Sequence, residues 1–267
     1  MGLGDDLMWR GEAYALHKQT GKRIRPHREN PKFGVPRKES RVAWQDADWI
    51  HNDGEVPLET HPNAGKRWYQ GGTPYRPRIS PITFSEHTMR WFDQVMRPKL
   101  PYVIINPYVK DKTRTKLNKY WPHFKELMLQ MPKMTYVQLT YGGNNEEVTL
   151  AQTHTVLVPW ATLLMKAVSH AHAIITTEGG MHHIAGNFQI PTVVIRGSAF
   201  GSRCTGYANQ INIERKAPCN TDATIGCQTT RRCTSCEDTM QKITPQTVVK
   251  AFEKCLALRR IDELNNM

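Results

Sequence analysis

Residues 173–197 read AIITTEGGMHHIAGNFQIPTVVIRG and predict a strand, a turn, a helix and a second strand. The outer runs, Ala173 to Thr177 and Pro191 to Gly197, are short, apolar and rich in β-branched residues, as in buried strands. Between them Glu178 to Gly180 turns the chain, and Met181 to Phe188 leaves room for two helical turns. This order describes one β-α-β unit, in which the strands run parallel.

The same alternation continues on both sides of this unit. Upstream, predicted strands at Tyr102 to Asn106 and Thr135 to Leu139 flank a helical pattern at His123 to Met131. A further helical pattern covers Ala161 to Ala171, and the Thr-Pro pair at 244–245 predicts the start of a last helix. We therefore expect an α/β fold whose parallel sheet is covered by helices on both faces.

The turn after Thr177 has the features of an anion site. Glycines at 179 and 180 let the backbone turn tightly, and the first N–H groups of the next helix then face whatever lies beyond the strand ends. His182 and His183 fall in the first turn of that helix. We expect one of them to face a ligand and the other to pack in the core.

The first hundred residues are less regular. Gly2 to Asp6 (GLGDD) looks like a glycine loop that opens a helix, and Gly21 ends this helix. Residues 26–98 hold most of the prolines and show little periodicity, so we expect an irregular lobe there, made largely of loops that wrap a bound molecule.

The composition is that of a globular, basic protein. Across 267 residues the formal net charge is +12, with 39% hydrophobic and 22% charged residues. No run approaches the ~20 apolar residues that cross a bilayer, and we expect a cytoplasmic protein. Between Lys18 and Arg41 nine basic residues face two acidic ones, so this tract is either a solvated loop or a surface for a polyanion.

Four of the six cysteines cluster near the end of the chain: Cys219, Cys227, Cys233 and Cys236. Four thiolates can close a tetrahedral zinc site, although the gaps between them match no common zinc-finger pattern. Structural zinc and packed or redox-active thiols both remain open. Cys204 and Cys255 are expected to be ordinary buried cysteines.

Several motifs together resemble the heptosyltransferase-like glycosyltransferases of family nine. The segment ITTEGGMHHIAGNFQIPTVVIRGS is similar to the signature of that family. Other matches occur in family order: GLGDD, INPY followed by NKYWP, LTYGGNNEE, and CTSCEDTMQKITPQTVVKA. The likeness covers about residues 99–258 and, less fully, residues 2–24.

The resemblance implies the GT-B architecture, in which two Rossmann-like lobes with parallel sheets face each other across a cleft. It assigns residues 1–98 to an abbreviated, irregular acceptor-side lobe and residues 99–267 to the lobe that holds the nucleotide sugar.

The resemblance also assigns roles to single residues. Asp5 is the expected general base, with Asp6 as the alternative, and Lys119 is the expected phosphate clamp, with Lys116 as the alternative. Ribose and diphosphate are assigned to Glu178, His183 and the amides of Gly179 and Gly180, and the base or ribose to Glu146 or Glu147.

The function that follows is metal-independent transfer of a sugar, hexosyl or heptosyl, from a nucleotide-sugar donor to an acceptor hydroxyl. The acceptor is a saccharide or, given the charge of +12, a modified base in DNA. A non-catalytic nucleotide-binding module is the alternative. We expect no transmembrane contact, and peripheral association with a membrane stays open. The sequence holds no GxxxxGK[ST], GxSxG or HExxH motif, so phosphoryl transfer, ester hydrolysis and zinc proteolysis lack their usual parts.

Overall fold

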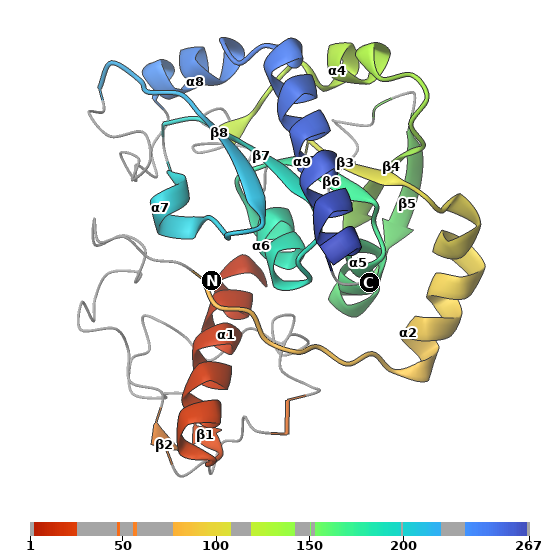
Figure 1. The fold of residues 1–267 in the computed structure, drawn as a ribbon, viewed down its shortest axis with the longest axis vertical. Coiled ribbons are helices and arrows are strands. Elements are labelled where there is room, and N and C mark those ends of the chain that lie inside the picture. The colour runs from red at the N-terminus through yellow and green to blue at the C-terminus, as the bar shows by residue number, and fades with distance from the viewer. Residues whose placement is uncertain are drawn as a thin grey trace.

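A parallel sheet of six strands forms the centre of the protein, shown as a computed structural model in Figure 1. The structure describes residues 3–25, 47–48, 56–57, 77–107, 119–141, 150, 153–198, 200–219 and 233–265. The strands are β3 (Val103–Asn106), β4 (Tyr136–Tyr141), β5 (His154–Val158), β6 (Ala173–Thr177), β7 (Thr192–Arg196) and β8 (Gln210–Glu214).

The strand order is β5-β4-β3-β6-β7-β8, and every neighbouring pair is parallel. The chain therefore builds outward from β3 in one direction, returns to the centre, and builds outward from β6 in the other. This is the doubly wound order of a Rossmann-like sheet, and its direction reverses between β3 and β6. A ligand crevice is expected where the carboxyl ends of these two strands lie side by side.

Helices cover both faces of the sheet. One face carries α2 (Glu86–Trp91), the helical turns η4 (Phe92–Met96) and η5 (Arg97–Lys99), α5 (Ala161–Ser169) and α6 (Gly180–Asn187). The other carries α4 (Phe124–Gln130), α8 (Thr234–Gln241) and α9 (Pro245–Asn265), and α9 lies along it in Figure 1. The short α7 (Ser202–Thr205) precedes β8.

The side chains of the central strands alternate between two hydrophobic cores. On β3, Ile104 packs with the cluster under α5 and α6, whereas Val103 and Ile105 pack with the cluster under α4 and α9. On β6, Ile174 and Ile175 divide in the same way. Every residue of β3, β6 and β7 is buried, as is typical of parallel strands covered on both sides.

A long N-terminal helix, α1 (Leu3–Thr20), lies outside the sheet and begins beside α6 (Figure 1). It ends at Gly21, whose φ of 69° is left-handed and whose N–H donates to the His17 carbonyl at 2.7 Å. After it, β1 (Ile24–Arg25) pairs in parallel with β2 (Val56–Pro57).

Buried polar contacts fasten α1 to α6 through the segment at residues 78–81. Asn187, at the end of α6, accepts from the Ser80 N–H at 2.9 Å and donates to the Ser80 carbonyl at 3.0 Å. Arg10 of α1 donates to the Ser80 hydroxyl at 3.1 Å and to the Pro81 carbonyl. We call Arg10, Ser80 and Asn187 the polar clamp.

The sequence predictions are confirmed for the central strands and for the start of α9, where the Thr247 N–H donates to the Thr244 hydroxyl at 3.4 Å. The sequence did not reveal β5 and β8, because both are edge strands with mixed polar and apolar residues. The loop predicted at Gly2 to Asp6 is wrong from Leu3 onward, since α1 begins there. Among the described helices, none is long and apolar enough to span a bilayer.

Candidate functional site

The site lies at the carboxyl ends of β3 and β6, where the winding of the sheet reverses. Asn106 ends β3 and donates from its side-chain amide to the Thr176 hydroxyl of β6 at 3.1 Å. Beyond these ends, Lys119 comes from the chain after β3, and Glu178 directly follows β6. Two charged residues far apart in sequence thus arrive at one edge of the sheet.

Lys119 and Glu178 form an ion pair, with side chains 21% and 9% exposed. The lysine ammonium also lies 4.6 Å from the centroid of the Phe200 ring. Trp121, fully buried two residues later, donates its indole N–H to the Ile243 carbonyl at 2.7 Å and so fixes the segment that carries Lys119. An ammonium has three N–H donors, so one pair with Glu178 leaves donors for a second anion.

The pKa of Glu178 reflects two opposed effects. Burial raises it, but the charges of Lys119 and Arg196, the hydrogen bond from Lys119 and the neighbouring His183 together lower it below its ordinary value. Glu178 is therefore ionised at neutral pH and holds the Lys119 ammonium in place.

Arg196, at the end of β7, lies in the core next to this pair. It donates to Asn212 at 2.7 Å and to the Thr205 hydroxyl at 2.8 Å, which ties α7 and β8 to the site. Its Nη2 atom and the Thr177 hydroxyl are buried without a hydrogen-bond partner among the described residues. Such groups are rare in folded proteins, and here they occur on neighbouring strands at the site edge.

The helix α6 begins at the same edge. Gly180, its first residue, is exposed, whereas His182 is fully buried. The His182 Nδ1 atom accepts from the Gly179 N–H at 3.0 Å, and its Nε2 atom donates to the Thr205 carbonyl at 3.0 Å. Burial, followed by the positive charges of His183 and Arg196, lowers the pKa of His182 well below its ordinary value. His182 is thus the packing histidine, and the Gly179 amide is used within the turn.

The side chain of His183, on α6, packs against the first turn of α1. Its Nδ1 atom is 3.2 Å from the Tyr207 hydroxyl, and burial raises the pKa of that tyrosine. On the other side, a Cβ added at Gly4 would lie 2.5 Å from the His183 ring, and one added at Gly180 would lie 3.9 Å from the Gly4 nitrogen. Glycine at position 4 is therefore what lets the first turns of α1 and α6 come together.

The structure brings together most of the residues that the sequence nominated. Lys119, Glu178, Gly179, Gly180 and His183 all lie at this edge of the sheet. The backbone of Asp5 is in the first turn of α1, next to Gly4, while its side chain is not among those described. Glu146, Glu147 and Lys116 lie outside the described residues.

Three contributors were missed by the sequence reasoning: Asn106, Arg196 and Tyr207. Asn106 and Arg196 each end a predicted strand, and a polar residue in that position is a signal that the sequence did offer. No comparable signal marked Tyr207, because it lies in an irregular segment before β8.

Glu178, His182 and His183 also bring their ligating atoms within 4.8 Å of one another. As a set of metal ligands they are poorly suited, because both ring nitrogens of His182 already have hydrogen-bond partners and Glu178 is paired with Lys119. The arrangement favours an anion instead, with an ammonium, a buried guanidinium and a helix N-terminus at one place.

Comparison with known proteins gives a fold and no family assignment. No protein-family model matches the chain, and no curated protein matches it. Among solved structures, the ADP-heptose LPS heptosyltransferase II of E. coli aligns with a TM-score of 0.50 and 16% identity, over 70% of this chain and 56% of that one.

A glycosyltransferase of family 9 from Veillonella parvula DSM 2008 aligns with a TM-score of 0.49 and 15% identity, over 68% of this chain and 54% of that one. The chain spans about half the length of these structures. Fold and site together thus define the class: an α/β protein with a Rossmann-like sheet and a Lys-Glu ion pair at the carboxyl edge of that sheet. Within that class, the fold is similar to that of heptosyltransferase II.

Proposed function

We propose that this protein is a glycosyltransferase that binds a nucleotide sugar at the edge formed by β3, β6 and the start of α6. One observation carries the proposal. An ion pair of Lys119 with Glu178 lies at the point where the sheet reverses its winding, beside an open helix N-terminus. Two phosphates joined to a nucleoside are the ligand that such an edge suits best.

In this proposal the diphosphate lies between Lys119 and the first turn of α6. Lys119 keeps its bond to Glu178 and turns its other donors to the phosphates, while the exposed Gly180 end of α6 offers amide N–H groups. Glu178 orients the lysine and accepts from a ribose hydroxyl. The unused Arg196 and Thr177 atoms supply further polar contacts below the site.

Transfer then requires a base near the sugar, and Asp5 is the candidate. Its carboxylate takes the proton of the acceptor hydroxyl as the acceptor oxygen bonds to the anomeric carbon. The bond from that carbon to the phosphate oxygen breaks, and the electron pair leaves with the nucleoside diphosphate. Lys119 and the α6 amides stabilise the growing charge on this leaving group, so the proposed reaction needs no catalytic metal.

The proposed donor carries a hexosyl or heptosyl sugar. The groups at the edge of the sheet bind its diphosphate and are the same for both sugars. The charge of +12 favours an anionic acceptor, either a charged saccharide or a modified base in DNA. We place the protein in the cytoplasm, where nucleotide sugars are available.

Donor binding tests the proposal. A panel of nucleotide sugars is screened by thermal shift, since a bound donor raises Tm, and raises it further when it binds more tightly or is more concentrated. At least one is expected to raise Tm, and Lys119→Met to abolish the shift. Lys125→Met is the matched control, because Lys125 is an exposed lysine on α4, away from the edge. No shift with any donor, or an equal loss in both variants, would overturn the donor assignment.

A second measurement separates enzyme from binding module. Donors that bind are incubated with candidate acceptors, and free nucleoside diphosphate is quantified. Release that depends on the acceptor supports transfer. Binding without release across charged saccharides and modified DNA supports the non-catalytic nucleotide-binding module.

A further inference from the structure

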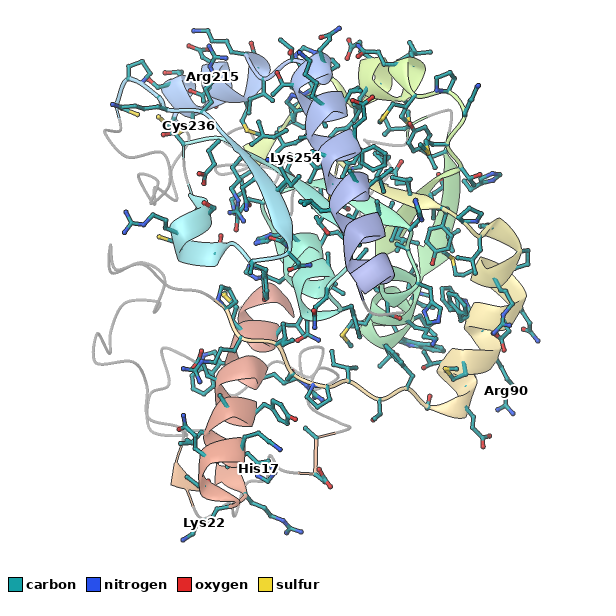
Figure 2. The ribbon with its side chains drawn as sticks, in the orientation of Figure 1. His17, Lys22, Arg90, Arg215, Cys236 and Lys254 are labelled. Atoms are coloured by element: carbon teal, nitrogen blue, oxygen red, sulfur yellow. The ribbon has the colours of Figure 1, made fainter. Side chains whose placement is uncertain are left out.

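Three cysteines meet near the start of α8, where Figure 2 labels Cys236 close to Arg215. Cys219 follows β8, Cys233 immediately precedes α8, and Cys236 lies in the first turn of α8. Their sulfur atoms all lie within 4.8 Å of one another, and those of Cys219 and Cys233 are 4.0 Å apart. None of these residues belongs to the donor site.

The spacing of the sulfur atoms suits a metal ion better than a disulfide. A disulfide bond is about 2.05 Å long, roughly half the separation of Cys219 and Cys233. In a tetrahedral zinc site with bonds of about 2.3 Å, neighbouring sulfur atoms lie about 3.8 Å apart. The observed 4.0 Å is close to that edge length. The three sulfur atoms thus lie close enough together to share one tetrahedral ion.

The local backbone holds two of the cysteines together. Cys233 caps α8, and its carbonyl accepts from the N–H groups of Cys236 and Glu237, both at 3.1 Å. Cys236 is buried and Cys219 exposed, so the cluster spans from the core to the surface.

We propose that Cys219, Cys233 and Cys236 bind one structural ion of the class that prefers tetrahedral thiolate coordination, of which zinc is the commonest and iron the alternative. The ion fastens the segment after β8 to the start of α8. Among the described residues, another link at this corner is the hydrogen bond that Arg215 donates to the Lys242 carbonyl at 3.1 Å, beyond the end of α8. Cys227 lies outside the described residues, and the proposal rests on the other three cysteines.

This ion would also support the donor edge from a distance. The Ala217 N–H, two residues before Cys219, donates to the Ser198 hydroxyl at 3.2 Å, and Ser198 follows β7 two residues after Arg196. Fixing Cys219 therefore fixes the segment that borders the end of β7. The role is structural, because no thiol of the cluster lies at the proposed reacting atoms.

Metal content tests the proposal independently of any sugar-transfer activity. The full chain is purified under reducing conditions without chelator, and zinc and iron are measured by elemental analysis. About one equivalent per chain is expected, falling to a small fraction in Cys219→Ser, Cys233→Ser and Cys236→Ser. Cys255→Ala is the control, because Cys255 is buried on α9 outside the cluster, and it should keep the full equivalent.

A second readout covers variants that fold poorly. Wild-type protein is stripped of metal and titrated with Co(II), which is expected to give a thiolate-to-cobalt charge-transfer band that Zn(II) displaces. The band strength also counts the thiolates, so Cys227→Ser shows whether a fourth sulfur completes the tetrahedron. No metal as purified and no Co(II) band would overturn the proposal, as would a mass two hydrogens lower that reveals a disulfide within the cluster.

Discussion

The sheet region and α1 are held in place by different kinds of interaction. The sheet buries apolar side chains in two clusters, one on each face. Neighbouring residues of a central strand belong to different clusters. The helix α1 meets α6 through Gly4 at one end and through the polar clamp further along. The residues of the proposed donor site lie on the first region and the proposed base on the second, so donor binding and catalysis should be separable by mutation.

The largest expected effect comes from the one residue proposed to act in catalysis from α1. Asp5→Asn keeps the size and polarity of the side chain but cannot accept a proton, so turnover should fall about 10²–10⁴-fold. Donor affinity should stay unchanged, because the proposed phosphate-binding groups lie on the sheet region. Turnover, donor affinity and Tm are measured on one preparation. Wild-type turnover in this variant would move the role to Asp6 or to another residue.

Gly4→Ala tests the close approach of the two helices. The new Cβ would lie 2.5 Å from the His183 ring, which is held by Tyr207, so α1 has to shift. A displacement of about 1 Å can lower turnover about 10²-fold, and we expect a loss of that order. Wild-type turnover in this variant would show that the contact at Gly4 does not position α1.

Asn187→Ala breaks the polar clamp from the side of α6. It leaves the Ser80 N–H and carbonyl without their partner in the interior, which should lower the free energy of unfolding by about 1–3 kcal/mol. Chemical denaturation measures this loss, and hydrogen exchange should show faster exchange in α1 than in the sheet. If exchange rose equally in both regions, α1 and the sheet would unfold as one unit.

The smallest expected effect concerns pH. Burial lowers the pKa of His182 well below 6.5, so the unfolded chain binds a proton at higher pH than the folded one. Above pH 6.5 His182 therefore does not lower the free energy of unfolding. Below that pH it lowers the free energy of unfolding by at most about 1.4 kcal/mol per pH unit. His182→Gln should flatten this slope. His170, whose pKa burial also lowers, contributes a slope of the same sign, so His170→Gln is measured alongside.

Sequence patterns predicted the sheet region well because its physical determinants are local. A buried parallel strand is mostly apolar and β-branched, as β3, β6 and β7 are, and a helix that follows a glycine turn begins within a residue or two of it. The edge strands β5 and β8 are half-exposed, so their sequences carried no such pattern.

The site was predictable only in part, for a related reason. Glu178, Gly180 and His183 belong to one short motif. Lys119 was a candidate because of its place before the Trp-Pro pair. The pairing of Lys119 with Glu178 joins residues 59 positions apart, and only the strand order brings them together. The polar clamp was not foreseeable either, because nothing in the neighbourhood of Arg10 indicates a partner at position 80 or 187.

The polar clamp also constrains the order of events during folding. Arg10 and Ser80 are 70 residues apart, and Ser80 and Asn187 are 107 apart. The Ser80–Asn187 contact spans more of the chain than the central strand pair of β3 with β6, whose partners are 70 residues apart, so a larger loop must close before it stabilises the chain. During translation, α1 therefore leaves the ribosome long before α6 exists for it to dock on. The helix that carries the proposed base should be among the last parts to reach its native position, so catalytic competence should lag behind formation of the sheet in refolding experiments.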